Sequence, residues 1–331
     1  MININNILRC LPNSLVRKID NFFSLSDTDL NININYLEEI RIRVNKPVIL
    51  KLGQVDYLIE YIPNTQEVLE ILQQICDNSI YSYQNQICNG FITLKGGHRV
   101  GIAGNVVIKD GKVINISYIS SLNFRIAKQV LGASDKVIKY VIDTDKSNIY
   151  NTLIVSPPGV GKTTILRDLI RRISNGLEQI NFKGLNIGVV DERGEIAAVY
   201  RGVPQNDVGI RTDILDGIPK ALGMTMLVRS MSPKVIAADE IGNKEDIEAI
   251  RYAICCGIKG IFTAHGSSID DIKLNPALNT LIENCYFDRI IFLTDKIEKC
   301  GIDSIYSLNK EGKFYSQLKI NNNLYELKGD I

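Results

Sequence analysis

The sequence predicts an α/β protein in which a mostly parallel sheet forms one domain and a smaller α+β domain precedes it. In the second half of the chain, short apolar runs alternate with segments of helical periodicity, which is typical of a doubly wound sheet. One of these runs leads through a glycine-containing loop directly into a helical pattern. In the first half, charged and apolar residues alternate over 39–44, as they do in half-buried strands. The length of 331 residues suits about two domains of roughly 150 residues each.

Short, mostly apolar runs in the second half are expected to form the parallel sheet, because strands covered on both faces are apolar throughout. These runs are Ile149–Val155, Asn186–Asp191, Val235–Glu240, Gly260–Ala264 and Arg289–Thr294. Helical patterns over 164–173 and 244–253 lie between them. The polar segment 140–148 is the expected junction, so we predict an N-terminal α+β domain over 1–145 and the α/β domain over 146–331.

The first half combines helical and strand patterns. Apolar residues recur at helical spacing near the N-terminus, from Ile7 to Phe22, and again over 65–80. The strand candidates are 39–44, 48–52, 54–61, 91–94, 99–108 and 113–119. Asp110-Gly111 separates the last two strands, which predicts a hairpin there.

Composition excludes several classes of function. The net charge of +1 gives no electrostatic footprint for nucleic acid or for a membrane surface. No run reaches the roughly 18 apolar residues of a membrane span, and the N-terminus has no compact apolar segment of a signal peptide. The seven cysteines are odd in number and contain no C-x-x-C pair, which favours a reduced, cytosolic protein over a disulfide framework or a zinc site.

The most informative motif is a phosphate-binding loop between the first apolar run and the helix that follows it. Its residues are Ser156, Pro157, Pro158, Gly159, Val160, Gly161, Lys162, Thr163 and Thr164. In such a loop, backbone N–H groups and the positive end of the helix bind the β-phosphate of a nucleotide. Lys162 is expected to reach the β- and γ-phosphates, and the Thr163 hydroxyl to bind Mg²⁺. Ser156 replaces the usual first glycine of the motif.

Three other strand candidates end in residues that suit nucleotide hydrolysis. Asp239 follows an apolar run and can join the Mg²⁺ coordination sphere, and Glu240 after it can activate water. Asp191 and Glu192 end a second run, and His265 ends a third, where it can sense the γ-phosphate. Ligands of open α/β sheets bind at this edge.

Several arginines are candidates for stabilising charge in the transition state. Arg193, Arg201, Arg211 and Arg229 lie between the phosphate loop and Asp239 in the sequence. The sequence does not decide which of them acts, or whether it acts within its own subunit or on a neighbour.

The three acidic and histidine-bearing strand ends, in this order after the phosphate loop, resemble the ATPase domain of the secretion ATPases, which drive type II, type IV pilus and type IV secretion machines. Finer motifs resemble a branch of that family from endospore-forming bacteria. These are 37–43, 96–101, 120–127, 156–158, 162–168, 190–193 and 229–233. Two features depart from the secretion pattern: the acidic segment is Asp191-Glu192-Arg193-Gly194-Glu195 instead of Glu-Asp-Pro-x-Glu, and Arg229 has an altered spacing to Pro233.

The resemblance implies a RecA-like P-loop ATPase domain that uses ATP and Mg²⁺ and assembles as a hexameric ring, with nucleotide bound between its two domains. It implies a cytoplasmic location in the mother cell, at the base of a channel to the forespore, and association with the membrane through membrane proteins of that complex. Lys162, Thr163 and Asp239 map to phosphate and metal roles, Glu192 or Glu240 to water activation, and His265 to the histidine box. Arg229 maps to the catalytic arginine, and Arg99 and Arg125 are candidates for nucleotide contacts from the first domain.

Two alternatives to a hydrolytic motor remain at this point. A nucleotide-gated assembly protein of the same complex would have nearly the same sequence and would hydrolyse little ATP. A small-molecule kinase would share the phosphate loop, but the chain has no clear arginine-rich lid. No nucleic-acid partner is expected, since there is no basic stripe.

Overall fold

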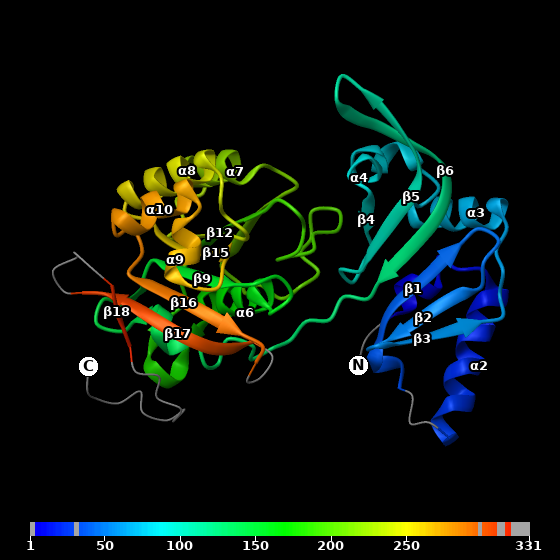
Figure 1. Ribbon diagram of the computed structural model, residues 1–331, viewed down its shortest axis with the longest axis horizontal. Coiled ribbons are helices and arrows are strands. Elements are labelled where there is room, and N and C mark those ends of the chain that lie inside the picture. Colours follow the sequence, from blue (N-terminus) through cyan, green and yellow to red (C-terminus); the bar gives the residue numbers. More distant parts are fainter. Residues whose placement is uncertain (1–3, 30–32, 297–299, 310–314, 319–331) are drawn as a thin grey trace. The chain divides into compact units, whose positions relative to one another are not determined.

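The structure is a computed structural model that describes residues 4–29, 33–296, 300–309 and 315–318 (Figure 1). The chain forms two compact units. The first comprises residues 1–128 together with 198–206, and the second comprises 129–197 and 207–331. The division therefore falls after Lys128, earlier than the expected boundary at 145/146.

The polar segment 140–148, expected as a junction, lies inside the second unit. Its two ends pair as the short strands β7 (Ile142–Asp143) and β8 (Asn148–Ile149). Ile142 and Ile149 are buried, so the polar residues between them belong to a tight turn and not to a linker.

The first unit is α+β, as expected, and is built on an antiparallel sheet of six strands in the order β3-β2-β1-β6-β5-β4. Its helices and strands are α1 (Asn5–Leu8), α2 (Asn13–Asp29), β1 (Leu37–Arg43), β2 (Val48–Leu52), β3 (Val55–Ile59), α3 (Thr65–Ile75), α4 (Gln84–Cys88), β4 (Phe91–Thr93), β5 (Arg99–Lys109) and β6 (Lys112–Arg125). Apolar residues at helical spacing on α2 and α3, such as Leu15, Ile19 and Leu72, pack with alternate sheet residues such as Ile40 in one core.

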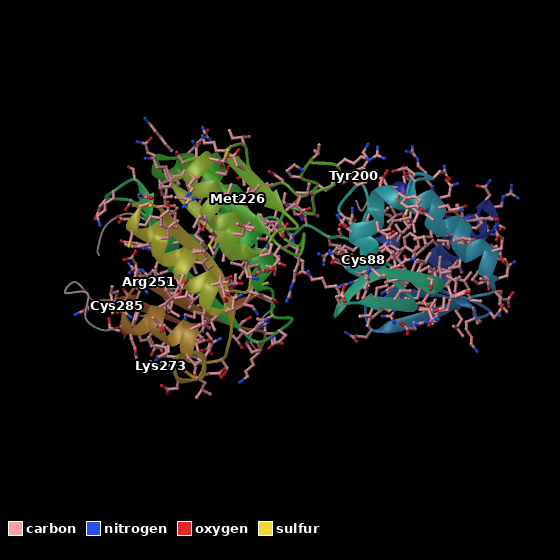
Figure 2. The ribbon with its side chains drawn as sticks, turned by 90° about the horizontal axis from the view of Figure 1, so that it is seen from above. Cys88, Tyr200, Met226, Arg251, Lys273 and Cys285 are labelled. Atoms are coloured by element: carbon pink, nitrogen blue, oxygen red, sulfur yellow. The ribbon has the colours of Figure 1, made fainter. Side chains whose placement is uncertain are left out.

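Residues 198–206 belong to the first unit although they lie far along the chain. Arg201 pairs with Asp77 at 2.6 Å, and the Gly96 N–H donates to Gln205 Oε1 at 2.7 Å. Figure 2 labels Tyr200 in this segment. Sequence periodicity does not predict that this segment packs with the first unit, because the segment forms no helix and no strand of a sheet.

The second unit contains the mostly parallel sheet, in the order β13-β12-β14-β15-β9-β16-β17-β18. Its elements are α5 (Ile138–Val141), β7, β8, β9 (Thr152–Ser156), α6 (Lys162–Asn175), β10 (Gly176–Leu177), β11 (Phe182–Lys183), β12 (Ile187–Asp191), β13 (Thr212–Asp216), α7 (Lys220–Ser230), β14 (Val235–Ala238), α8 (Lys244–Cys255), β15 (Lys259–His265), α9 (Ile269–Lys273), α10 (Pro276–Glu283), β16 (Arg289–Thr294), β17 (Gly301–Leu308) and β18 (Tyr315–Gln317). The first six strands in the sheet order run parallel, while β17 and β18 are antiparallel additions. All five expected apolar strands are present. The edge strand β13 was not predicted, because it contains polar residues and is not an apolar run.

Helices cover both faces of this sheet (Figure 1). On one face, Leu227 of α7, Ile250 of α8 and Leu281 of α10 pack with the sheet in a single core. α6 lies on the other face, where Ile165, Leu166 and Leu169 are fully buried. This doubly wound arrangement brings the carboxyl ends of β9, β12, β14 and β15 to one edge.

No helix in the described part of the chain has the length and apolar character needed to cross a membrane.

We predict that Asp168→Asn destabilises the protein at neutral pH by about 1–3 kcal/mol, the scale for a buried charged acceptor. Asp168 is 2% exposed and accepts hydrogen bonds from Ser134 and Arg171. Burial alone would raise the pKa of Asp168, but these hydrogen bonds outweigh it and the pKa is lowered. The carboxylate therefore stabilises the fold above its unfolded pKa and loses this effect as the pH falls through its folded pKa.

Urea denaturation at several pH values measures this effect. The difference between wild type and Asp168→Asn should shrink on acidification, whereas Asp135→Asn, in an exposed ion pair with Arg172, should change stability little at any pH. A difference that does not depend on pH would contradict the assignment.

Candidate active site

The phosphate loop joins β9 to α6 as the motif predicts. Gly159 has φ 81° and Gly161 has φ 114°, a backbone region that favours glycine. Ser156 is the last residue of β9, is fully buried and does not have a positive φ. Its hydroxyl donates to the Pro157 carbonyl at 2.8 Å. A serine is therefore compatible with this first position, because the backbone there still follows the strand.

The N-terminus of α6 has no side-chain cap. Its N-cap residue is Gly161, and no side chain accepts a hydrogen bond from the first-turn amides. By contrast, Asn243 caps α8 by accepting from the Asp246 N–H at 2.7 Å. Uncapped N–H groups together with the helix dipole form an anion site, so the start of α6 fits a phosphate group.

Cys300 lies against this loop, a contact that no sequence pattern indicates. A Cβ placed on Gly161 would come within 2.3 Å of Cys300 Sγ. The positive φ favours glycine at 161, and a larger residue there would also require the Cys300 thiol to move aside.

Lys162 is buried, with 5% exposure, and its ammonium group is fully engaged. It donates to the Ser156 carbonyl at 3.0 Å and to the Pro157 carbonyl at 3.2 Å, and it lies 3.1 Å from His265 Nδ1. Burial lowers the pKa of Lys162, while the negative charges of Asp239 and Glu240 oppose that shift. Binding a phosphate oxygen requires the ammonium group to exchange one of these partners, since it has only three protons to donate.

Asp239 joins three elements at the sheet edge. One of its carboxylate oxygens accepts from the Thr163 hydroxyl of α6 at 2.5 Å, and the other accepts from the Thr263 hydroxyl of β15. Burial raises the pKa of Asp239, and the two hydroxyl donors lower it by less. The predicted metal residues Thr163 and Asp239 are thus in direct contact, and Thr263 is an additional member that sequence reasoning missed.

Glu240, His265 and Arg193 form a polar chain that continues from Lys162. An ammonium group can only donate, so the contact with Lys162 makes His265 Nδ1 an acceptor and leaves Nε2 to donate to Glu240 Oε1 at 3.0 Å. The other oxygen of Glu240 pairs with Arg193 at 2.5 Å. Glu240 also has φ 53°, unusual for a residue with a side chain, and its N–H donates to the Thr263 hydroxyl at 2.8 Å. Strained backbone of this kind is concentrated at functional sites.

The acidic segment after β12 is organised around Asp191, which is 2% exposed. Its carboxylate accepts from the N–H groups of Glu195, Ile196 and Ala197 at 2.8–3.1 Å, so its role here is to hold the loop. Glu192 is instead available at the surface and forms an ion pair with Lys220 of α7. Both residues of this pair line a pocket together with Asp239 and Glu240.

The remaining predicted residues lie elsewhere. Arg229 is exposed at the end of α7, where it lines a surface groove between α7 and α8 with Thr225, Glu245 and Tyr252. Met226 of α7 and Arg251 of α8 are labelled on these helices in Figure 2. In the first unit, Arg99 stacks over the Phe91 ring at 4.3 Å. Arg125, at the end of β6, is exposed.

The donor set fits a nucleotide with its metal ion. Among the described residues, no group of three or more His, Cys, Asp and Glu side chains is arranged to hold a metal ion by itself. One hydroxyl and one carboxylate beside a phosphate site are the usual protein ligands for Mg²⁺, which takes its other ligands from phosphate and water. Thr163 and Asp239 supply that pair.

Comparison with known proteins identifies the family. The family model for "Sporulation stage III, protein AA" matches residues 5–313. The chain belongs to this family. Stage III sporulation protein AA of Bacillus subtilis (strain 168) is 41% identical over 282 residues, which cover 85% of this chain and 89% of the relative.

Solved structures of secretion ATPases share the fold of this family member. The ATPase DotB of Legionella pneumophila superposes with a TM-score of 0.58 at 15% identity, covering 91% of this chain and 82% of DotB. DotB of Yersinia pseudotuberculosis gives a TM-score of 0.54 at 14% identity, covering 95% and 81%. The predicted fold class, a RecA-like P-loop domain preceded by a smaller α+β domain, is confirmed.

We predict that Gly161→Ala weakens nucleotide binding by about 10- to 100-fold, because strain of about 1–3 kcal/mol at a positive φ would distort the loop. Titration with a fluorescent ATP analogue measures the dissociation constant. Cys300→Ala in the Gly161→Ala background should recover part of the loss, since it removes the thiol that the new Cβ would meet. Tight binding by Gly161→Ala would contradict the geometry of the loop.

Proposed function

We propose that this member of the sporulation stage III, protein AA family is a Mg²⁺-dependent ATPase. The observation that carries the proposal is the meeting of Lys162, Thr163, Asp239, Glu240 and His265, from α6 and the ends of β14 and β15, at one sheet edge. Bound Mg²⁺ would neutralise charge on the phosphates. Lys162 and the open amides of α6 bind the phosphates, and Thr163 and Asp239 hold the metal ion.

Glu240 is the stronger candidate for activating water. It follows Asp239 at the end of β14 and is oriented by His265, and an orienting partner is what a catalytic base needs. The His265 ring contacts both Lys162 and Glu240. Movement of Lys162 on binding phosphate would therefore also move the imidazole that orients Glu240. Glu192 lines the same pocket and acts from the adjacent strand β12.

The family and the fold support a proposal for the biological role. We propose that the chain works in the mother cell, as a hexameric ring associated with membrane proteins of a channel complex between mother cell and forespore, and that hydrolysis powers or gates that channel. Arg229, exposed on α7, is positioned at the surface and is proposed to serve a neighbouring subunit's nucleotide. Nucleotide contacts from Arg99 and Arg125 of the first unit stay predictions.

A second candidate function is nucleotide-dependent gating with little hydrolysis. The ion pair between Arg193 and Glu240 favours it, because the guanidinium contacts one carboxylate oxygen and His265 the other, which leaves less of the carboxylate available to a water molecule. In this case ATP binding, and not turnover, would set the assembly state.

We predict that Lys162→Ala abolishes phosphate release by the purified chain and greatly weakens ATP binding, because it removes the phosphate-binding ammonium group. Lys139→Ala, which changes a lysine beside the Tyr140 ring, is the matched control and should behave as wild type. Steady-state phosphate release and analogue titration measure the two effects. Equal, substantial release by wild type and Lys162→Ala would overturn the proposed hydrolytic function.

We predict that Glu240→Gln keeps ATP binding but lowers turnover by at least about 100-fold, the scale for loss of a general base. Glu70→Gln, which changes an exposed carboxylate on α3 that accepts a hydrogen bond from Gln66, is the matched control. Single-turnover assays and oligomer size with and without ATP separate chemistry from binding and assembly. Wild-type turnover by Glu240→Gln together with an inactive Glu192→Gln would assign water activation to Glu192 instead.

A further inference from the structure

Lys220 is a mostly buried cation in the pocket to which the proposed function assigns no role. It is the first residue of α7, follows the N-cap Pro219, and its side chain is 11% exposed. Lysine is rarely buried without a partner, and here the ammonium group pairs with Glu192 Oε2. A long side chain held at the base of a helix in this way has little freedom, so it fixes where the Glu192 carboxylate lies.

A second carboxylate lies close enough to Lys220 to interact with its charge. Asp246 of α8 is 1% exposed and accepts from the Gly242 and Asn243 N–H groups. Burial raises the pKa of Asp246, the positive charge of Lys220 lowers it, and the negative charge of Glu192 raises it again. Without the lysine, the buried Asp246 carboxylate and the partly exposed Glu192 carboxylate would repel each other.

The same cation belongs to the pocket that holds the candidate catalytic carboxylates. The cations Lys220 and Arg193 line it together with five carboxylates, so negative groups outnumber positive ones there; the carboxylates are those of Asp191, Glu192, Glu195, Asp239 and Glu240. Glu192 follows β12, and β12 pairs directly with β14, which ends beside Asp239. In the absence of Lys220, repulsion from these carboxylates would drive Glu192 toward solvent, where its side chain is already 37% exposed.

We propose that Lys220 is a positioning residue that holds the Glu192 carboxylate at the catalytic pocket, acting through Glu192 and not on the nucleotide. The inference rests on the proposed hydrolytic function. It also predicts that loss of Lys220 loosens the acidic loop, residues 192–197, which can be measured without turnover. The reason is that Glu192 is next to Asp191, whose carboxylate accepts hydrogen bonds from residues 195–197.

The test is a double-mutant cycle with Lys220→Met, Glu192→Gln and their combination. Each single change should lower kcat between about 10- and 100-fold, the scale for a misplaced catalytic group, with the affinity for a fluorescent ATP analogue within about twofold of wild type. The combination should be no slower than the slower single variant, because both changes remove one interaction. Lys220→Arg should recover most of the activity.

A matched control is Lys259→Met, which removes a partly exposed lysine paired with Asp288 at 3.1 Å, away from the pocket. Amide hydrogen exchange over residues 192–197 should become faster in Lys220→Met and stay unchanged in Lys259→Met. Multiplied effects in the double variant, loss of nucleotide affinity in Lys220→Met, or unchanged exchange in the acidic loop would each overturn the inference. Wild type that releases no more phosphate than Lys162→Ala would overturn the hydrolytic function, while the exchange measurement would still decide whether Lys220 orders this loop.

Discussion

The contact of Asp239 with Thr163 and Thr263 is the interaction on which the rest of the site depends. It ties the end of β14 to the start of α6 and to β15 by two hydroxyl-to-carboxylate hydrogen bonds. Hydrogen bonds to a charged group contribute about 1.5–3 kcal/mol each, which offsets part of the cost of burying that group. The sheet edge is therefore held together by polar contacts, and Lys162, Glu240 and His265 are placed relative to this one carboxylate.

The arrangement continues outward from Asp239 in two directions. Thr263 also accepts from the Glu240 N–H, which sets the strained backbone of that residue and aims its side chain at His265. On the other side, Thr163 is next to Lys162, whose ammonium group contacts the same imidazole. These contacts form a closed ring, in which Lys162 and the candidate base Glu240 both contact His265.

Local sequence patterns were sufficient to predict the residues proposed to contact phosphate, because the loop, its glycines and the following helix are contiguous in the sequence. The strand ends bearing Asp239, Glu240 and His265 were also predictable, since parallel strands bring their carboxyl ends to one edge. Thr263, Lys220 and Cys300 were not, because their importance arises only from contacts between elements far apart in the sequence. The sequence also gave no sign that 198–206 packs with the first unit, since its ion pair with Asp77 spans more than a hundred residues.

α7 carries two residues of the proposed mechanism, one at each end of the helix. The helix begins at Lys220, beside Glu192, and its last turn carries Arg229. Its 11 residues span about 16 Å at 1.5 Å per residue. Gly223 allows the helix to lie directly on β12, because a Cβ there would come within 2.6 Å of Val190. Met224 and Leu227 of α7 are buried in the same core as Val190 of β12. One helix packed on β12 thus carries both Lys220, which pairs with Glu192 at the end of that strand, and Arg229.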